Sequence, residues 1–180
     1  GMIDVLVMIC CSADWIANFG TSDDQAVWNF TSYALQQNPN TRIALAMPWR
    51  DFPGDFDDAA EHRNATDQLY PLWKNMASRL SSDFNNAEVF TFYHGAAMYE
   101  LREMFESGNL SDVNQMQGPA ETSLFTDQKG HAGQIVRDLG TLLWLAAIHG
   151  VDPLTMPEFT QYQTDIRLIA RAILDEQSQS

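Results

Sequence analysis

Three short apolar runs, each bounded by polar or small residues, constrain the fold of this chain most strongly. They cover Ile3 to Ile9, Arg42 to Met47 and Ala87 to Tyr93. Runs of this length rich in Val, Ile, Leu, Met and Phe are typical of strands buried on both faces. Helical patterns lie between the runs, and this alternation indicates right-handed parallel crossovers. The sequence therefore predicts an α/β fold, a three-layer α/β/α sandwich with a mostly parallel sheet.

The helical segments carry signals for where they end. Pro39 ends the first helix, and Pro71 divides the second into two pieces, because proline lacks an amide donor. From His131 onward, apolar residues recur at three-four spacing until Gly150, which is a typical C-terminal cap. The segment from Leu110 to Gly130 shows no such period and is expected to be mostly loop.

The charge balance excludes several kinds of partner. The chain of 180 residues has 24 acidic and 10 basic residues, a formal net charge of −14. Such a chain repels phosphate backbones and anionic lipid surfaces, so we expect neither nucleic acid nor a membrane as a partner. Its hydrophobic content of 45% is that of a folded protein rather than a disordered one.

Two features of the sequence bear on where the protein is located, the first apolar run and the cysteines. The run has no basic residues before it and contains Asp4, so it reads neither as a signal peptide nor as a transmembrane span. Cys10 and Cys11 are adjacent, which suits small buried side chains in a reducing, cytoplasmic setting better than a disulfide. Gly1 before Met2 is typical of a tag remnant, so a single domain is expected over residues 2–180.

Ligands of open parallel sheets bind beyond the carboxyl ends of the strands. Four segments are expected to meet there: Cys10 to Trp15, Pro48 to Asp55, Tyr93 to Gly95, and Ser123 to Gly133.

The last of these segments contains an acid shortly before a histidine at a helix start. Asp127 could hold one ring nitrogen of His131, leaving the other nitrogen to take a proton from a nucleophile. Alternatively, Asp127 only caps the helix and His131 sits in its first turn. Spacing alone leaves both interpretations open.

The same block resembles the closing block of SGNH-type (GDSL-like) hydrolases. It consists of Asp127, Gly130-His131 and Gly133, followed by an apolar helix that ends in Leu145 to Pro153. Other stretches are similar to strands of that family in the same order. Ile3 to Ile9 is similar to the central strand, Asn38 to Leu45 to the strand that follows it, and Val89 to Gly95 to the strand before the closing block.

The resemblance implies a flavodoxin-like sandwich that hydrolyses a small ester or acylated substrate without cofactor or metal. In that family a serine attacks the carbonyl while an Asp–His pair activates it. His131 would be the base and Asp127 its orienting partner. The position three residues before His131, where the family has its aspartate, is Gln128 here.

The family's opening block is not found in the sequence, which has neither a Gly-Asp-Ser-like nor a Gly-x-Asn-Asp stretch. Ser12, directly after the first apolar run, is then the candidate nucleophile. The alternative is a truncated or degenerate relative that keeps the fold as a binding module, with the first strand absent. A sheet with an open edge would associate, so a homodimer is expected.

Other polar and aromatic residues allow two interpretations each. His94 faces the site or satisfies a local carbonyl, whereas the position of His149 at a helix end is explained by the helix dipole. Four acids could suggest calcium, but their spacing fits no EF-hand loop and capping explains the last two: Asp51, Asp55, Asp57 and Asp58. Three aromatic residues line a substrate wall or pack a loop: Trp49, Phe52 and Phe56.

Overall fold

The computed structural model describes residues 3–9, 26–85 and 87–179, which form two compact units. The first unit contains the described residues up to Pro48 together with Asp67–Tyr93. The second contains Trp49–Thr66 and the chain from His94 onward. The expectation of a single domain stays a prediction.

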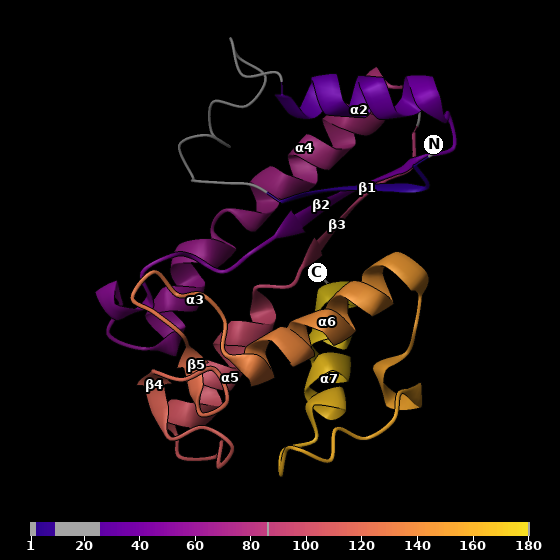
Figure 1. Ribbon diagram of the computed structural model, residues 1–180. Helices are drawn as coiled ribbons and strands as arrows, with labels where there is room; N and C mark the ends of the chain where they lie inside the picture. Colours follow the sequence, from indigo (N-terminus) through magenta and orange to yellow (C-terminus); the bar gives the residue numbers. More distant parts are fainter. Residues whose placement is uncertain (1–2, 10–25, 86, 180) are drawn as a thin grey trace. The chain divides into compact units, whose positions relative to one another are not determined.

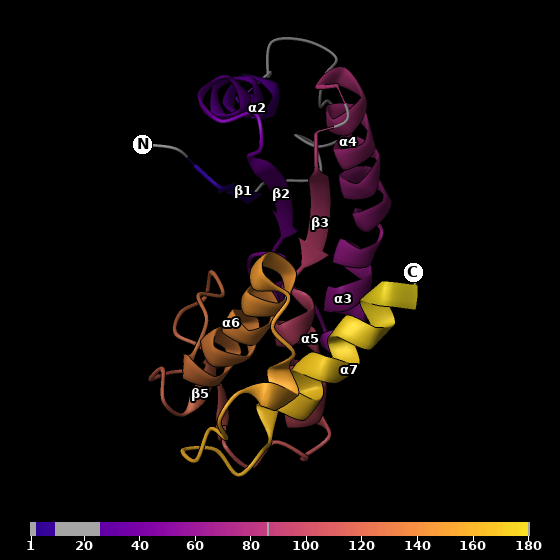
Figure 2. The same cartoon turned by 90° about the vertical axis from the view of Figure 1, so that its right-hand side faces the viewer.

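The first unit is built on a parallel sheet of three strands, β1 (Val5–Ile9), β2 (Arg42–Met47) and β3 (Val89–Tyr93). The strands lie side by side in the order β1-β2-β3, as Figure 2 shows. Val5 lies opposite Arg42, and Ile43 lies opposite Val89. All three apolar runs therefore form the strands predicted for them, and the α/β class with a parallel sheet is confirmed.

Two helices, α2 (Ala26–Gln37) and α4 (Tyr70–Asp83), cover one face of this sheet (Figure 1). Right-handed crossovers between strands that are neighbours in sequence and in space bring both helices to the same face. The helices contact each other through the Trp28 indole, whose Nε1 donates to Asp83 Oδ2 at 2.8 Å. Three residues of α2 are buried: Val27, Thr31 and Ala34.

The second unit is mainly helical. It contains α3 (Ala59–Asp67), α5 (Ala96–Glu106), α6 (Gln134–His149), α7 (Ile166–Gln179), the 3₁₀ turns η1 (Pro53–Asp55) and η2 (Pro153–Thr155), and the short strands β4 (Gln115–Gln117) and β5 (Ser123–Phe125). Helices α5, α6 and α7 pack against one another in pairs. Their contact buries a shared core that includes Leu101, Val136, Leu139, Leu142, Ile166, Ala170 and Ile173. None of the described helices combines the length and apolarity needed to cross a membrane.

The helix boundaries follow the predicted signals with two differences. Pro71 lies in the first turn of α4, after α3 has ended at Asp67, and Gly150 caps α6 with a φ of 66°. However, α6 begins at Gln134 rather than at His131, because Gly133 is extended and its N–H donates to Leu124 O at 2.7 Å. The expected loop also contains β4 and β5, which are too short at three residues each to show a period.

Candidate functional site

The Asp127–His131 pair lies in a tight turn between β5 and α6. The turn is closed by the backbone N–H of Thr126, which donates to His131 O at 2.7 Å. An antiparallel bridge between Phe125 and Ala132 continues this pairing by one residue on each side. Residues 126 and 131 therefore face each other as in a hairpin, which explains how an aspartate four residues before the histidine reaches its ring.

The two side chains are in direct contact. Asp127 Oδ2 lies 2.5 Å from His131 Nδ1, while Oδ1 accepts the backbone N–H groups of Gly130 at 3.1 Å and His131 at 3.2 Å. The hydrogen bond from the His131 ring, helped by these two backbone donors, holds the pKa of Asp127 below its usual value. The carboxylate thus braces the turn and holds the ring at once. The alternative that Asp127 caps the helix with His131 in its first turn is wrong, because α6 begins at Gln134 and its N-cap Gly133 has no side-chain capping bond.

The contact sets the proton positions on the imidazole. An ionised Asp127 can only accept, so the proton of a neutral His131 ring lies on Nδ1 and the lone pair on Nε2. The His131 side chain is 64% exposed, and Nε2 has no hydrogen-bond partner among the described residues. This arrangement is the one required of a general base.

Two glycines make the turn possible. Gly130 has a φ of 97°, in the region that disfavours other residues, and a Cβ there would lie 2.8 Å from Pro53 Cδ. Gly133 approaches β5 so closely that a Cβ would lie 1.9 Å from Ser123 O. The spacing Gly-His-x-Gly therefore has a local structural cause on each side of the histidine.

The segment after β2 in the chain, Trp49 to Pro53, holds the turn from outside. Trp49 Nε1 donates to Gly130 O at 2.9 Å, and the Phe52 N–H donates to Lys129 O at 2.9 Å. Phe52 adopts a left-handed conformation with a φ of 59°, which is unusual for a bulky residue. Pro53 is buried next to Gly130. Three successive contacts thus fix this segment to the residues immediately before His131.

His94 lies beside the same segment. Its ring is 6.1 Å from the Trp49 ring in an edge-on arrangement and 5.5 Å from the Trp144 ring. Burial lowers the pKa of His94 to about 4, so the ring is neutral at pH 7. Three of the four segments expected to meet, those containing Trp49, His94 and His131, are therefore brought together in the second unit. The fourth, which includes Ser12, lies outside the described residues, as do Cys10 and Cys11.

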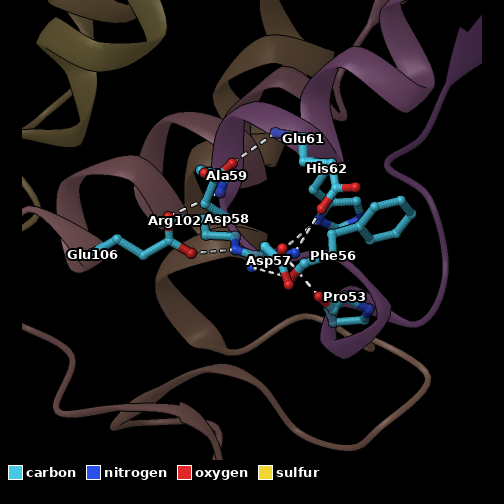
Figure 3. Close-up of polar contacts among 9 residues, drawn as sticks. All are labelled: Pro53, Phe56, Asp57, Asp58, Ala59, Glu61, His62, Arg102 and Glu106. Carbon is cyan, nitrogen blue, oxygen red and sulfur yellow. Dashed lines mark hydrogen bonds and ion pairs between the residues drawn. The ribbon is translucent and has the colours of Figure 1, made fainter.

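Beneath the Trp49–Pro53 segment lies a buried guanidinium, shown in Figure 3. Arg102 is 3% exposed and donates from Nη1 to Pro53 O and from Nη2 to Phe56 O, both at 3.0 Å. Its Nε donates to Glu106 Oε1 at 2.6 Å, which neutralises the buried charge. Glu106 Oε2 also accepts the N–H of Ala59 at the start of α3.

His62 completes this buried cluster. Arg102 Nη1 lies 3.1 Å from His62 Nδ1, and because a guanidinium can only donate, Nδ1 carries the lone pair. The proton on Nε2 is then donated to Arg50 O at 2.8 Å. Burial, together with the nearby positive charge of Arg102, lowers the pKa of His62 to about 4. The sequence analysis did not predict a role for His62 or Arg102. The one sequence signal for this cluster was that Arg102 lies on the apolar face of the Ala96–Glu106 helix, where a charged residue needs a buried partner.

The remaining predicted residues have structural roles in the described chain. Asp58 Oδ1 accepts the Glu61 N–H at 2.8 Å, so the predicted capping by Asp58 is confirmed. Phe56 stacks on the His62 ring with 4.4 Å between centroids, which is loop packing rather than a substrate wall. His149 is the last residue of α6, as expected. Within the described residues, no three His, Cys, Asp or Glu side chains gather as metal ligands.

An open hollow of about 690 Å³ lies in the first unit. It is lined by the C-terminal turns of α2 and α4 and by residues just before β2 and β3, including Gln36, Asn40, Phe84 and Glu88. Because it lies at the amino ends of the strands, it is not the site expected from the topology of a parallel sheet.

No protein family model, no curated protein and no solved structure matches this chain. The candidate site therefore depends on the geometry of the residues themselves.

Proposed function

We propose that this protein is an SGNH-like hydrolase that cleaves small ester or acylated substrates, with His131 as the base and Asp127 as its orienting partner. The observation that carries the proposal is the 2.5 Å contact between Asp127 Oδ2 and His131 Nδ1, with Nε2 left exposed. No cofactor or metal takes part in the proposed reaction.

In the proposed reaction His131 Nε2 removes the proton of the Ser12 hydroxyl as the oxygen attacks the ester carbonyl. The tetrahedral intermediate collapses to an acyl-serine, and the alcohol leaves with the proton returned by His131. Water, activated by the same nitrogen, then releases the acid. Asp127 keeps the ring in the correct tautomer and stabilises the imidazolium that forms in each step.

The strand order supports the fold part of the proposal. A flavodoxin-like sheet has the order 2-1-3-4-5, so its third, fourth and fifth strands are neighbours in sequence order. The order β1-β2-β3 is that of the latter three strands. We therefore propose that the sheet corresponds to this part of a three-layer, flavodoxin-like sandwich, with β1 as the central strand.

The same strand order favours a second candidate function, a non-catalytic binding module. If β1 corresponds to the central strand, Ser12 follows that strand and not the first strand, where the family carries its nucleophile. The proposed base would then lack its usual partner. The two candidates differ in whether the chain turns over an ester at all.

Hydrolysis of p-nitrophenyl acetate and butyrate by the wild type and variants decides between them. We expect Ser12→Ala and His131→Ala each to lower kcat by roughly 10³-fold or more. Asp127→Asn is expected to lower it strongly while leaving KM nearly unchanged, because the ring loses its orientation. His149→Ala removes an exposed histidine far along α6 and serves as the control with wild-type rates.

Two outcomes would contradict the hydrolase. Background rates for all proteins favour the binding module, and equal rates for wild type and His131→Ala show that any turnover arises elsewhere. Loss of activity in His131→Ala but not in Ser12→Ala would keep the base and remove Ser12 as the nucleophile.

A further inference from the structure

We propose that Trp49 is a positioning residue for the Asp127–His131 pair, acting through its indole N–H on Gly130. The inference rests on the proposed function only in treating that pair as the reactive group; the positioning itself is a statement about geometry.

Trp49 contacts the turn at Gly130, where a backbone movement would change the position of His131 relative to Asp127 most directly. Gly130 is one residue before His131, and its own N–H donates to Asp127 Oδ1 at 3.1 Å. Its carbonyl accepts from Trp49 Nε1 at 2.9 Å. Asp127 fixes the peptide plane before Gly130, and the plane after it is held at both edges, by Trp49 at the Gly130 carbonyl and by Asp127 Oδ1 at the His131 N–H. Releasing the carbonyl leaves this second plane held only by the carboxylate, so the His131 backbone can tilt relative to Asp127.

The side chains of the Asp127–His131 pair have little support from packing. The side chains of Asp127 and His131 are 46% and 64% exposed, so packing holds neither of them. Exposed ion pairs are weak because the free energy gained is offset by side-chain entropy and screened by solvent. A short Asp–His contact at such a site therefore requires a backbone held by other means. The bond from the Thr126 N–H to His131 O holds the turn from within, and Trp49, Phe52 and Pro53 hold it from outside.

The segment from Trp49 to Pro53 is itself held in place by hydrogen bonds. Arg50, next to Trp49, donates its N–H to Tyr99 Oη at 3.1 Å and accepts from His62 Nε2 at 2.8 Å. Pro53 O accepts from the buried Arg102. The backbone that follows Trp49 is thus attached to α3 and α5 through buried and part-buried hydrogen bonds. A group fixed in this way can impose a position on the turn, rather than follow it.

The experiment records the Nδ1–H proton resonance of the His131 ring by NMR in wild type, Trp49→Phe and Asp127→Asn. Trp49→Phe keeps an aromatic ring and removes only the donor. We expect the downfield Nδ1–H resonance of the wild type to weaken or move upfield in Trp49→Phe, toward its behaviour in Asp127→Asn, because the carboxylate no longer holds the ring closely. In the esterase assay, kcat is expected to fall about tenfold with KM nearly unchanged.

Trp28→Phe is the matched control. It removes an indole N–H that donates to an oxygen, Asp83 Oδ2, at 2.8 Å in the first unit. If loss of such a bond acted only through general stability, both variants would change the His131 Nδ1–H resonance alike. We expect this resonance in Trp28→Phe to equal that of the wild type.

A measurement without any variant guards against a Trp49→Phe protein that does not fold. In the wild type, a scalar coupling through the hydrogen bond is expected between Trp49 Nε1 and the Gly130 carbonyl carbon. Absence of this coupling overturns the proposal, as does an unchanged His131 Nδ1–H resonance in folded Trp49→Phe. A changed Nδ1–H resonance in a protein that hydrolyses no ester supports the positioning role and contradicts the hydrolase alone.

Discussion

Single residues decide the geometry of the candidate site, and the glycines do so most directly. After the turn from Thr126 to His131, the chain returns to β5 at Gly133, whose N–H donates to Leu124 O. Because the nearest atom to a Cβ at this position would be the backbone oxygen of Ser123, no side-chain rotation can make room. Ser123 is buried as well, so its strand cannot move outward without breaking core contacts.

Gly133→Ala is therefore expected to destabilise the protein by roughly 2–4 kcal/mol, in the range of overpacked buried positions. Gly140→Ala is the control with the opposite sign. Gly140 lies inside α6 with nothing within 4 Å of a Cβ, so alanine is expected to add roughly 0.5–1 kcal/mol through helix propensity. Urea unfolding of both variants measures the difference. Equal stabilities would show that β5 and the turn adjust to the added methyl group.

At the scale of elements, the apolar runs and proline positions predicted most of the described fold. β1, β2 and β3 were predictable because a buried parallel strand leaves an uninterrupted apolar run, and α3 and α4 because Pro71 cannot continue a helix. The Asp127–His131 pair was predictable as one of two alternatives from residue types and spacing. The hydrogen bonds of Trp49, His62 and Arg102 were not, because they join segments distant in sequence through single donor and acceptor atoms.

The connection between α3 and α5 depends on His62 remaining neutral. The folded-state pKa of His62 is about 4, below the 6.5 of an unperturbed histidine, and the same holds for His94. As the pH falls below 6.5, the unfolded chain binds a proton first, so stability present above that pH is lost down to about pH 4. At pH 5 each histidine is expected to cost about 2 kcal/mol of the free energy of unfolding.

Urea unfolding at pH 7 and pH 5 measures this loss in wild type, His62→Gln and His94→Gln. Each variant is expected to remove about half of the pH dependence, although His62→Gln also lowers stability at pH 7 by disturbing the bonds to Arg102 and Arg50. His149→Gln serves as the control for loss of an exposed histidine. A pH dependence that is the same in all four proteins would show that neither buried ring governs acid stability.

For the whole molecule, the feature that favours assembly is the β1 edge of the sheet. Among the described residues β1 pairs only with β2, and exposed edges invite pairing with another chain. The Trp28 side of α2 faces α4, while Phe30 and Tyr33 lie on the opposite flank and are 61% and 62% exposed. Two copies related by a twofold axis would pair their β1 strands antiparallel and bring these aromatic flanks together.

We therefore expect a homodimer that the double substitution Phe30→Glu and Tyr33→Glu converts to monomer, measured by light scattering at micromolar concentration. Asn75→Glu adds a charge to an exposed position of α4, outside the proposed interface, and is expected to leave the dimer intact. Because each chain carries a formal charge of −14, the copies repel each other, and the repulsion is screened by salt. Raising the salt from about 20 mM to about 200 mM should therefore strengthen the wild-type dimer. A wild-type monomer at both salt concentrations would contradict the assembly, and a dimer that withstands both glutamates would place its interface away from α2.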